Sequence, residues 1–132
     1  MRTLFLALLV SLSACFVGGH AEHAAARRGF TFLGDRVVQG GADHDAIGVG
    51  AADGRWHSMM IVVENAPIEL YDVVVTFGDG ERFSPPTRLV FGTDSRSRVI
   101  DLPGNARFIR RVDFAYGNLV AGAQAKVELW AR

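Results

Sequence analysis

Alternation of apolar and polar side chains, broken at short intervals by glycine and proline, constrains this chain more than any other feature. It is clearest in residues 97–116, where two alternating segments flank a Pro-Gly pair. One face of the first segment carries Arg98, Ile100 and Leu102, and one face of the second carries Val112, Phe114 and Tyr116. A period of two residues is that of a β-strand with two unlike faces. The stretch therefore predicts two strands.

The pair Pro103 and Gly104 predicts how these two strands are joined. Proline presets φ for the second position of a type II turn, and glycine supplies the positive φ that the third position needs. We therefore expect residues 102–105 to turn and the two strands to pair as an antiparallel hairpin.

The alternation slips by one residue before Val112, because Ile109 lies three residues earlier. Both side chains can face the core only if a β-bulge inserts one extra residue, and Arg110 and Arg111 are the expected site. In a regular strand Phe108 would face inward instead and Arg110 with it, and a buried charge needs a partner. We therefore adopt the bulge.

The remaining sequence after residue 30 repeats this pattern without helical periodicity. Residues 56–64 are apolar on both faces from Met59 onward, which is typical of a central strand. Residues 77–81 have Asp-Gly at the tip of an expected hairpin, and the final strand, 123–130, is expected to expose one face. Further strands are expected at residues 30–38, 46–49, 68–77, 81–83 and 89–91. The sequence predicts an all-β fold, a single antiparallel β-sandwich or flattened barrel of about eight strands, preceded by a signal peptide.

The first 17 residues predict export. Arg2 is their only charge, and the apolar run LFLALLVSLSACFV has the length of a signal-peptide core and is too short to span a bilayer. We expect residues 1–26 to form a signal peptide and flexible tether, and residues 27–132 to form the single β-sandwich domain. The expected localisation is periplasmic or secreted.

Two interpretations of the processing site remain open. The small-x-small sites at residues 19–21 and 24–26 place cleavage after Ala21 or Ala26. Alternatively, residues 12–15 (Leu-Ser-Ala-Cys) resemble the lipobox of bacterial lipoproteins, in which Cys15 becomes lipidated. Cys15 is the only cysteine of the chain, so the domain has no internal disulfide under either interpretation and depends on its core for stability.

The charge balance limits the kind of partner. Lys plus Arg and Asp plus Glu number 14 each. A nucleic-acid partner held through many phosphates would require a basic excess, so we expect none. Membrane contact is expected only if Cys15 carries a lipid.

Five segments, FLGDRVV, DHDAIGV, IELYDVVVTFGDGE, SRVIDLPGNARFIRRVDFAY and VELWAR, lie between residues 32 and 132. In combination they resemble a family of small exported bacterial domains of unknown function. The resemblance covers almost the whole chain after the leader. It implies an all-β fold outside the cytoplasm, and it carries over no activity and no catalytic residue.

Asp43 and Asp45, flanked by glycine, have two interpretations. Two carboxylates with backbone carbonyls suit Ca²⁺, which would make this a weak calcium-dependent site, for instance in a glycan-binding domain. The alternative is a solvated polar loop in which each aspartate accepts hydrogen bonds from nearby amides. We favour the loop, since a calcium site usually has more oxygen ligands.

A catalytic function would have to use His44 or His57, with Asp45 orienting the base, as in a small hydrolase-like enzyme. The serines lack the glycine pattern of a nucleophile elbow, and no cysteine follows the leader. We therefore expect a protein that is not an enzyme and needs no cofactor.

Charged side chains concentrate around the predicted hairpin. Arginine forks bind carboxylate and sulfate well, so an anion or acidic-sugar site is one interpretation. A cross-strand ladder of ion pairs is the other. The candidate ligand-binding surface comprises Arg98, Arg107, Arg110, Arg111 and Trp130, the last as a platform for sugar stacking. The expected function is an exported non-catalytic binding or interaction module whose partner is a glycan, an envelope component or another protein.

Overall fold

The computed structural model describes residues 28–40, 43–50, 54–86 and 89–132. The signal peptide, the tether and the lipidation of Cys15 lie outside these residues and stay predictions. Within them the chain forms strands and no helix, and so no helix that could cross a membrane. The strands are β1 (Thr31–Gln39), β2 (Asp43–Gly48), β3 (Ser58–Glu64), β4 (Ile68–Phe77), β5 (Arg82–Phe83), β6 (Leu89–Phe91), β7 (Ser95–Arg96), β8 (Ile100–Asp101), β9 (Ile109–Gly117) and β10 (Gln124–Ala131).

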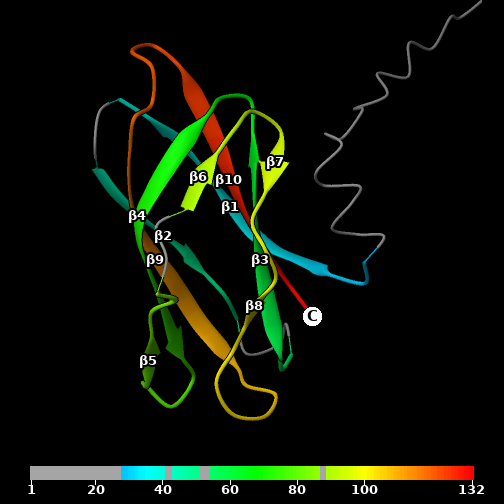
Figure 1. The fold of residues 1–132 in the computed structure, drawn as a ribbon. Coiled ribbons are helices and arrows are strands. Elements are labelled where there is room, and N and C mark those ends of the chain that lie inside the picture. The colour runs from blue at the N-terminus through cyan, green and yellow to red at the C-terminus, as the bar shows by residue number, and fades with distance from the viewer. Residues whose placement is uncertain (1–27, 41–42, 51–53, 87–88) are drawn as a thin grey trace, which may run out of the picture.

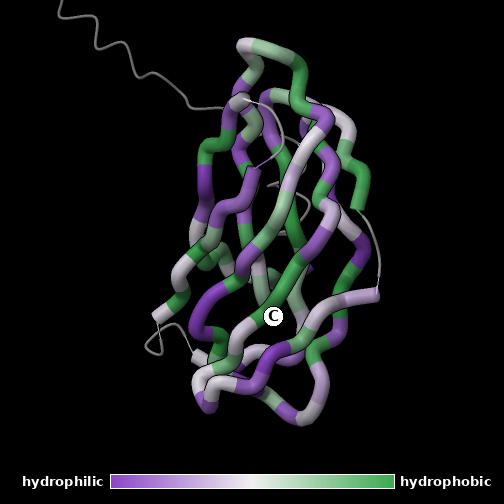
Figure 2. Tube along the Cα trace, turned by 90° about the vertical axis from the view of Figure 1, so that its left-hand side faces the viewer, coloured by the Kyte–Doolittle hydropathy of each residue, from purple (hydrophilic) through white to green (hydrophobic). Residues whose placement is uncertain are grey.

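The strands form two antiparallel five-stranded sheets, which confirms the predicted sandwich (Figure 1). Sheet A has the order β1-β10-β3-β7, and β8 also pairs with β3. Sheet B has the order β2-β9-β4-β5, and β6 also pairs with β4. Apolar and polar residues alternate along the strands, as Figure 2 shows. The inward apolar side chains of both sheets form one core cluster, which includes Ile61, Val75, Phe77, Phe114 and Leu129.

The predicted hairpin between residues 97 and 116 is wrong. β8 pairs with β3 in sheet A, whereas β9 lies between β2 and β4 in sheet B. The loop at Pro103 and Gly104 therefore connects the two sheets. Ile100 and Phe114 are both buried in the same core cluster. A period of two residues shows which side chains face inward, but it does not show whether two strands pair edge to edge or lie in opposite sheets.

Gly104 has the positive φ that the sequence predicts, +85°. We expect Gly104→Val to lower the free energy of unfolding by about 1 to 3 kcal/mol, because a β-branched residue is strained at this φ. A shift of at least about 4 °C in the melting temperature should follow. Gly104→Asn is the control, since asparagine tolerates this conformation better. Equal melting temperatures for Gly104→Val and the wild type would contradict the prediction.

The predicted bulge in β9 is confirmed. Thr76 of β4 is opposite Arg111, and Phe77 is opposite Ile109, so Arg110 is the extra residue. Ile109 and Val112 are both buried, and the arginines between them are exposed.

A second bulge, in β4, was not predicted. The register shifts between Leu70 and Asp72, so that Leu70 and Val73 both face the core and Tyr71 is half-buried. Without this shift, strict alternation would place Tyr71 on the same face as Val73.

β3 is a central strand, as predicted, and all seven of its residues are buried. The prediction that the last strand exposes one face is wrong, because β10 lies between β1 and β3 and Glu128 is 1% exposed. Glu128 is accommodated by its neighbours. Lys126 Nζ lies 2.7 Å from Glu128 Oε1, and Trp130 Nε1 donates a hydrogen bond to Glu128 Oε2 at 3.0 Å.

Candidate functional site

The β4–β5 hairpin and the loop that follows β8 meet at one end of the sandwich. The predicted hairpin at residues 77–81 is confirmed. The amide of Phe77 donates to the carbonyl of Glu81 at 2.8 Å, and the amide of Gly80 donates to the carbonyl of Phe77 at 2.9 Å. Gly80 has a φ of +90°, which explains the glycine at this position. The hairpin is therefore an ordered support for the side chains that it carries.

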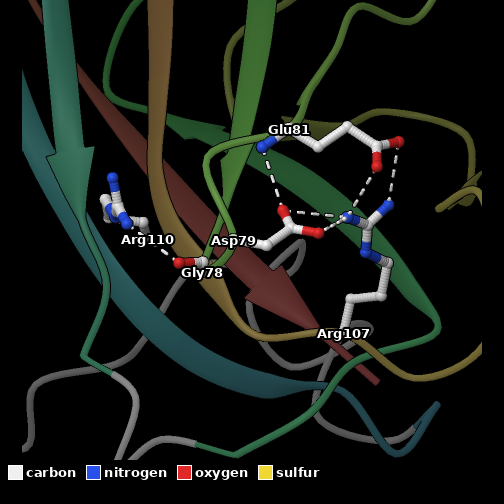
Figure 3. Close-up of polar contacts among 5 residues, drawn as sticks. All are labelled: Gly78, Asp79, Glu81, Arg107 and Arg110. Atoms are coloured by element: carbon white, nitrogen blue, oxygen red, sulfur yellow. Dashed lines mark hydrogen bonds and ion pairs between the residues drawn. The ribbon is translucent and has the colours of Figure 1, made fainter.

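Arg107, in the loop before β9, is fixed by two carboxylates of this hairpin (Figure 3). Its Nη2 donates to Asp79 Oδ2 at 3.0 Å, and its Nη1 donates to Glu81 Oε1 at 3.2 Å. Its Cζ also lies 3.8 Å from the centroid of the Phe77 ring, a cation–π contact. The side chain of Arg107 is 17% exposed, whereas those of Asp79 and Glu81 are 63% and 60% exposed. The guanidinium is thus held in one place at the surface of the core.

The charges of this cluster reinforce one another. The backbone amide of Glu81 holds the pKa of Asp79 below its usual value, and Arg107 lowers that pKa further. The hydrogen bond and charge of Glu81 raise the pKa of Arg107, and the charge of Asp79 adds to this. A lowered carboxyl pKa stabilises the folded state above the usual pKa of Asp79, and the effect is lost as the pH falls through the lowered value. Because Asp79 is exposed, that contribution to stability is small.

Two neighbouring hollows lie beside this cluster. The first has a volume of about 250 Å³, and Arg55, Phe77, Asp79 and Arg107 contribute to its lining. The second has a volume of about 260 Å³ and is lined by Val49, Ile109 and Arg110. Gly78 and Phe108 line both hollows.

Gly78 and Phe108 form the wall between the two hollows, and their backbones are in close contact. The amide of Gly78 donates to the carbonyl of Phe108 at 2.8 Å. A Cβ atom at position 78 would lie 3.2 Å from Cβ of Phe108, which is tighter than ordinary contact. Glycine at position 78 therefore lets the hairpin approach residue 108.

Arg55 and Arg110 lie on the two sides of this wall. Arg55 Cζ is 4.6 Å from the centroid of the Phe108 ring. Arg110 Nη2 donates to the carbonyl of Gly78 at 2.8 Å, and Figure 3 shows Arg110 and Arg107 approaching the hairpin from different sides. In the part of the chain that the structure describes, neither Arg55 nor Arg110 has a carboxylate within ion-pair distance.

The structure brings together two of the five residues of the predicted ligand-binding surface, Arg107 and Arg110. Arg111 points away and forms a fork with Asp113, at 2.9 Å and 2.6 Å. Arg98 and Trp130 belong to the region of sheet A. Trp130 is half-buried there, edge-on to Phe32 with ring centroids 5.5 Å apart. Both residues of this fork belong to β9, so the pair lies along one strand and is not a cross-strand ladder.

The sequence pattern does not mark Arg55, Asp79 or Glu81 as site residues. The hairpin turn was recognised, and its two acidic residues were the available signal. No sequence signal marks Arg55, because it is brought to the site by the isolated bridge between its neighbour Trp56 and Arg107. That bridge joins residues about fifty positions apart.

Asp43 and Asp45 do not lie in a loop, and that expectation is wrong. β2 begins at Asp43, and the two aspartates pair with Tyr116 and Phe114 of β9. Each Oδ1 accepts a hydrogen bond at 2.8 Å from the next backbone amide, and Arg36 Nε lies 3.6 Å from Asp45 Oδ1. Burial raises the pKa of Tyr116, and the charges of both aspartates raise it further. Among the described residues no group of three or more His, Cys, Asp or Glu side chains is placed to hold a metal ion.

We expect at most a small rise in melting temperature when the chelator is replaced by a few millimolar calcium. Two carboxylates that already accept amide hydrogen bonds would give at best the weak, roughly millimolar class of site. A tight site would stabilise the fold by about 2.7 kcal/mol at a hundredfold excess over its dissociation constant. The double variant Asp43→Asn with Asp45→Asn is the control. A large shift at micromolar calcium that disappears in this variant would contradict the prediction.

The two histidines lie in different parts of the fold. His44 is exposed on β2 of sheet B, with Nε2 3.5 Å from Asp113 Oδ1. His57 is exposed just before β3 of sheet A, and its amide donates to the carbonyl of Arg132. The structure gives the pair of histidines no common site.

No curated protein matches the chain. A chain from a structural and functional characterization of Pseudomonas aeruginosa AlgX is similar in structure over 78% of this chain and 26% of its own length, with 12% sequence identity and a TM-score of 0.49. This chain thus spans about a quarter of that protein's length. A family model described as a domain of unknown function, DUF2541, matches residues 4–131, and the chain therefore belongs to this family.

Proposed function

We propose that this protein is an exported, non-catalytic binding module that acts in the periplasm or outside the cell, with its ligand site at the two hollows beside Arg107. Export is supported by the apolar leader that follows Arg2. The ligand is a glycan or another component of the cell envelope.

The observation that carries the proposal is the fixed position of Arg107. Two carboxylates and the Phe77 ring hold its guanidinium before any ligand arrives. A site that is ordered in advance loses less conformational entropy on binding. Neighbouring aromatic and charged side chains of this kind are common in small-molecule sites, which occupy roughly 300 to 1,000 Å³. Each hollow, at about 250 Å³ and about 260 Å³, suits one unit of a longer ligand.

Binding is favoured over hydrolysis by the state of the acidic pair. A general acid needs a carboxyl group with a raised pKa. The pKa of Asp79 is lowered instead, and both Asp79 and Glu81 are occupied by Arg107. Such carboxylates orient a cation and accept hydrogen bonds.

Two experiments test the proposal. The intact mass of the protein recovered from the cell envelope should show that the leader has been removed after Ala21 or Ala26, or that Cys15 carries acyl chains. A chain that still starts at Met1 would contradict export.

The second experiment locates the ligand. A glycan array with the mature domain identifies binders, and backbone NMR shifts then map the site. Perturbations should concentrate in residues 77–81 and 106–110, and Arg107→Gln should weaken binding. Arg36→Gln is the matched control, because Arg36 is an exposed arginine that pairs with Asp45. Perturbations confined to other surfaces would contradict the proposed site.

A further inference from the structure

The charges around the two hollows do not balance locally. Three guanidinium groups, those of Arg55, Arg107 and Arg110, contribute to the lining, and the carboxylates of Asp79 and Glu81 both pair with Arg107. Arg55 and Arg110 are left without a carboxylate among the described residues. The described residues at these hollows therefore carry a positive excess, although the whole chain has a formal net charge of zero.

These two guanidinium groups are held in place by uncharged contacts. Arg55 stacks over the Phe108 ring, and Arg110 donates to the carbonyl of Gly78 at 2.8 Å. A guanidinium has five N–H donors in a planar fork, so one bond to a carbonyl leaves most of them available. Charge-assisted pairs between arginine and a carboxylate or sulfate are stronger than hydrogen bonds between neutral groups.

The backbone explains why both side chains reach the hollows. Arg110 is the extra residue of the β9 bulge, so its side chain is outside the core alternation. Arg55 precedes Trp56, whose amide and carbonyl exchange hydrogen bonds with Arg107 at 2.8 Å and 3.0 Å. Both arginines are thus attached to paired backbone on the two sides of the wall formed by Gly78 and Phe108.

We infer that the ligand of this site is acidic, and that carboxylate or sulfate groups of a saccharide bind to Arg55 in one hollow and to Arg110 in the other, on the two sides of Phe108. The inference rests on the proposed function, because it uses the same hollows. Arg107 then has a different role from its two neighbours. Its charge is already compensated, so the Arg107–Asp79–Glu81 cluster offers fixed donors and acceptors to the hydroxyl groups of the ligand.

The test uses the mature domain and three probes titrated by calorimetry: a tetrasaccharide of uronic acids, the same tetrasaccharide with its carboxyl groups reduced to alcohols, and a sulfated tetrasaccharide. We expect at least one acidic probe to bind about tenfold or more tightly than the neutral one. The comparison of the two acidic probes distinguishes carboxylate from sulfate. Raising the salt concentration should weaken binding of the acidic probes and leave binding of the neutral probe unchanged, since salt screens charge interactions.

Variants assign the effect to individual side chains. Arg55→Gln and Arg110→Gln should each weaken binding of the acidic probe about tenfold and leave the neutral probe unaffected. Arg55→Lys keeps the charge and loses the fork, so it should fall between the wild type and Arg55→Gln. Arg36→Gln should bind like the wild type. Melting temperatures of all variants within a few degrees of the wild type show that folding is not the cause.

The outcomes distinguish failure of the acidic ligand from failure of the binding module. Equal binding of neutral and acidic probes at residues 77–81 and 106–110, unchanged in Arg55→Gln and Arg110→Gln, would overturn the acidic ligand and leave the binding module intact. Acidic binding that maps by NMR to other residues would overturn the assignment to Arg55 and Arg110. Absence of binding by all three probes would count against both proposals.

Discussion

Phe114→Ala should lower the free energy of unfolding by about 3 to 5 kcal/mol, the usual cost of removing a buried aromatic side chain. Phe114 is 2% exposed on β9, and its ring lies 6.1 Å from that of Tyr116 in the core between the sheets. The substitution loses apolar burial and leaves a cavity that the two paired sheets cannot easily close. Because domains of this size have a total stability of about 5 to 15 kcal/mol, a large part of it is lost.

Denaturant unfolding of the mature domain measures this effect. Phe32→Ala is the matched control, because Phe32 is 47% exposed on β1 and its ring lies in a T-shaped contact with that of Trp130. The control should lose less than about 1 kcal/mol, close to ordinary surface substitutions. Equal losses for the two variants would mean that the core does not lie between β9 and sheet A.

Lys126→Met is expected to cost about 3 kcal/mol. It removes the cation that lies 2.7 Å from Glu128 Oε1, while the carboxylate remains in a position that is 1% exposed. Breaking a buried ion pair by removing one partner costs about 3 to 5 kcal/mol. The lower end applies here, because the Lys126 side chain is 29% exposed and Trp130 Nε1 still donates to Glu128.

A second substitution shows whether the buried carboxylate of Glu128 causes the loss. Adding Glu128→Leu to Lys126→Met removes the carboxylate and should restore most of the stability, since apolar replacement of a buried pair is often neutral. Thermal unfolding of the single and double variants provides the comparison. A double variant that is less stable than Lys126→Met would show that Glu128 stabilises the fold by some other means.

The sequence predicts the strands and turns of this fold better than it predicts which strands pair. Turn chemistry and alternation located the β4–β5 hairpin, the central strand β3 and the bulge at Arg110 correctly, because each depends on a few adjacent residues. The pairing of β8 with β3 depends on where the chain goes after Pro103, and local alternation carries no information about that. The same limit applies to β10, whose polar side chains suggested solvent although Glu128 is buried by its neighbours.

The candidate site was only partly predictable for a related reason. Arg107 and Arg110 were noticed because they belong to a dense run of charges. Their significance depends on which acidic residues the fold brings to each of them, and Asp79 and Glu81 come from a hairpin about thirty residues away. Arg55 joins them through a single backbone bridge, for which the sequence has no signal.

The pairing of β1 with β10 has a consequence for when this domain can fold. These strands lie at opposite ends of the described chain, and consecutive strands repeatedly change from one sheet to the other. Contacts between distant residues require a large loop to close first, and such topologies fold slowly. Neither sheet can be completed from a contiguous stretch, so sheet A has to wait for the residues of β10. A chain with this delay stays unfolded for longer after synthesis. The export that we propose would require this state, because a protein passes through a narrow membrane channel unfolded.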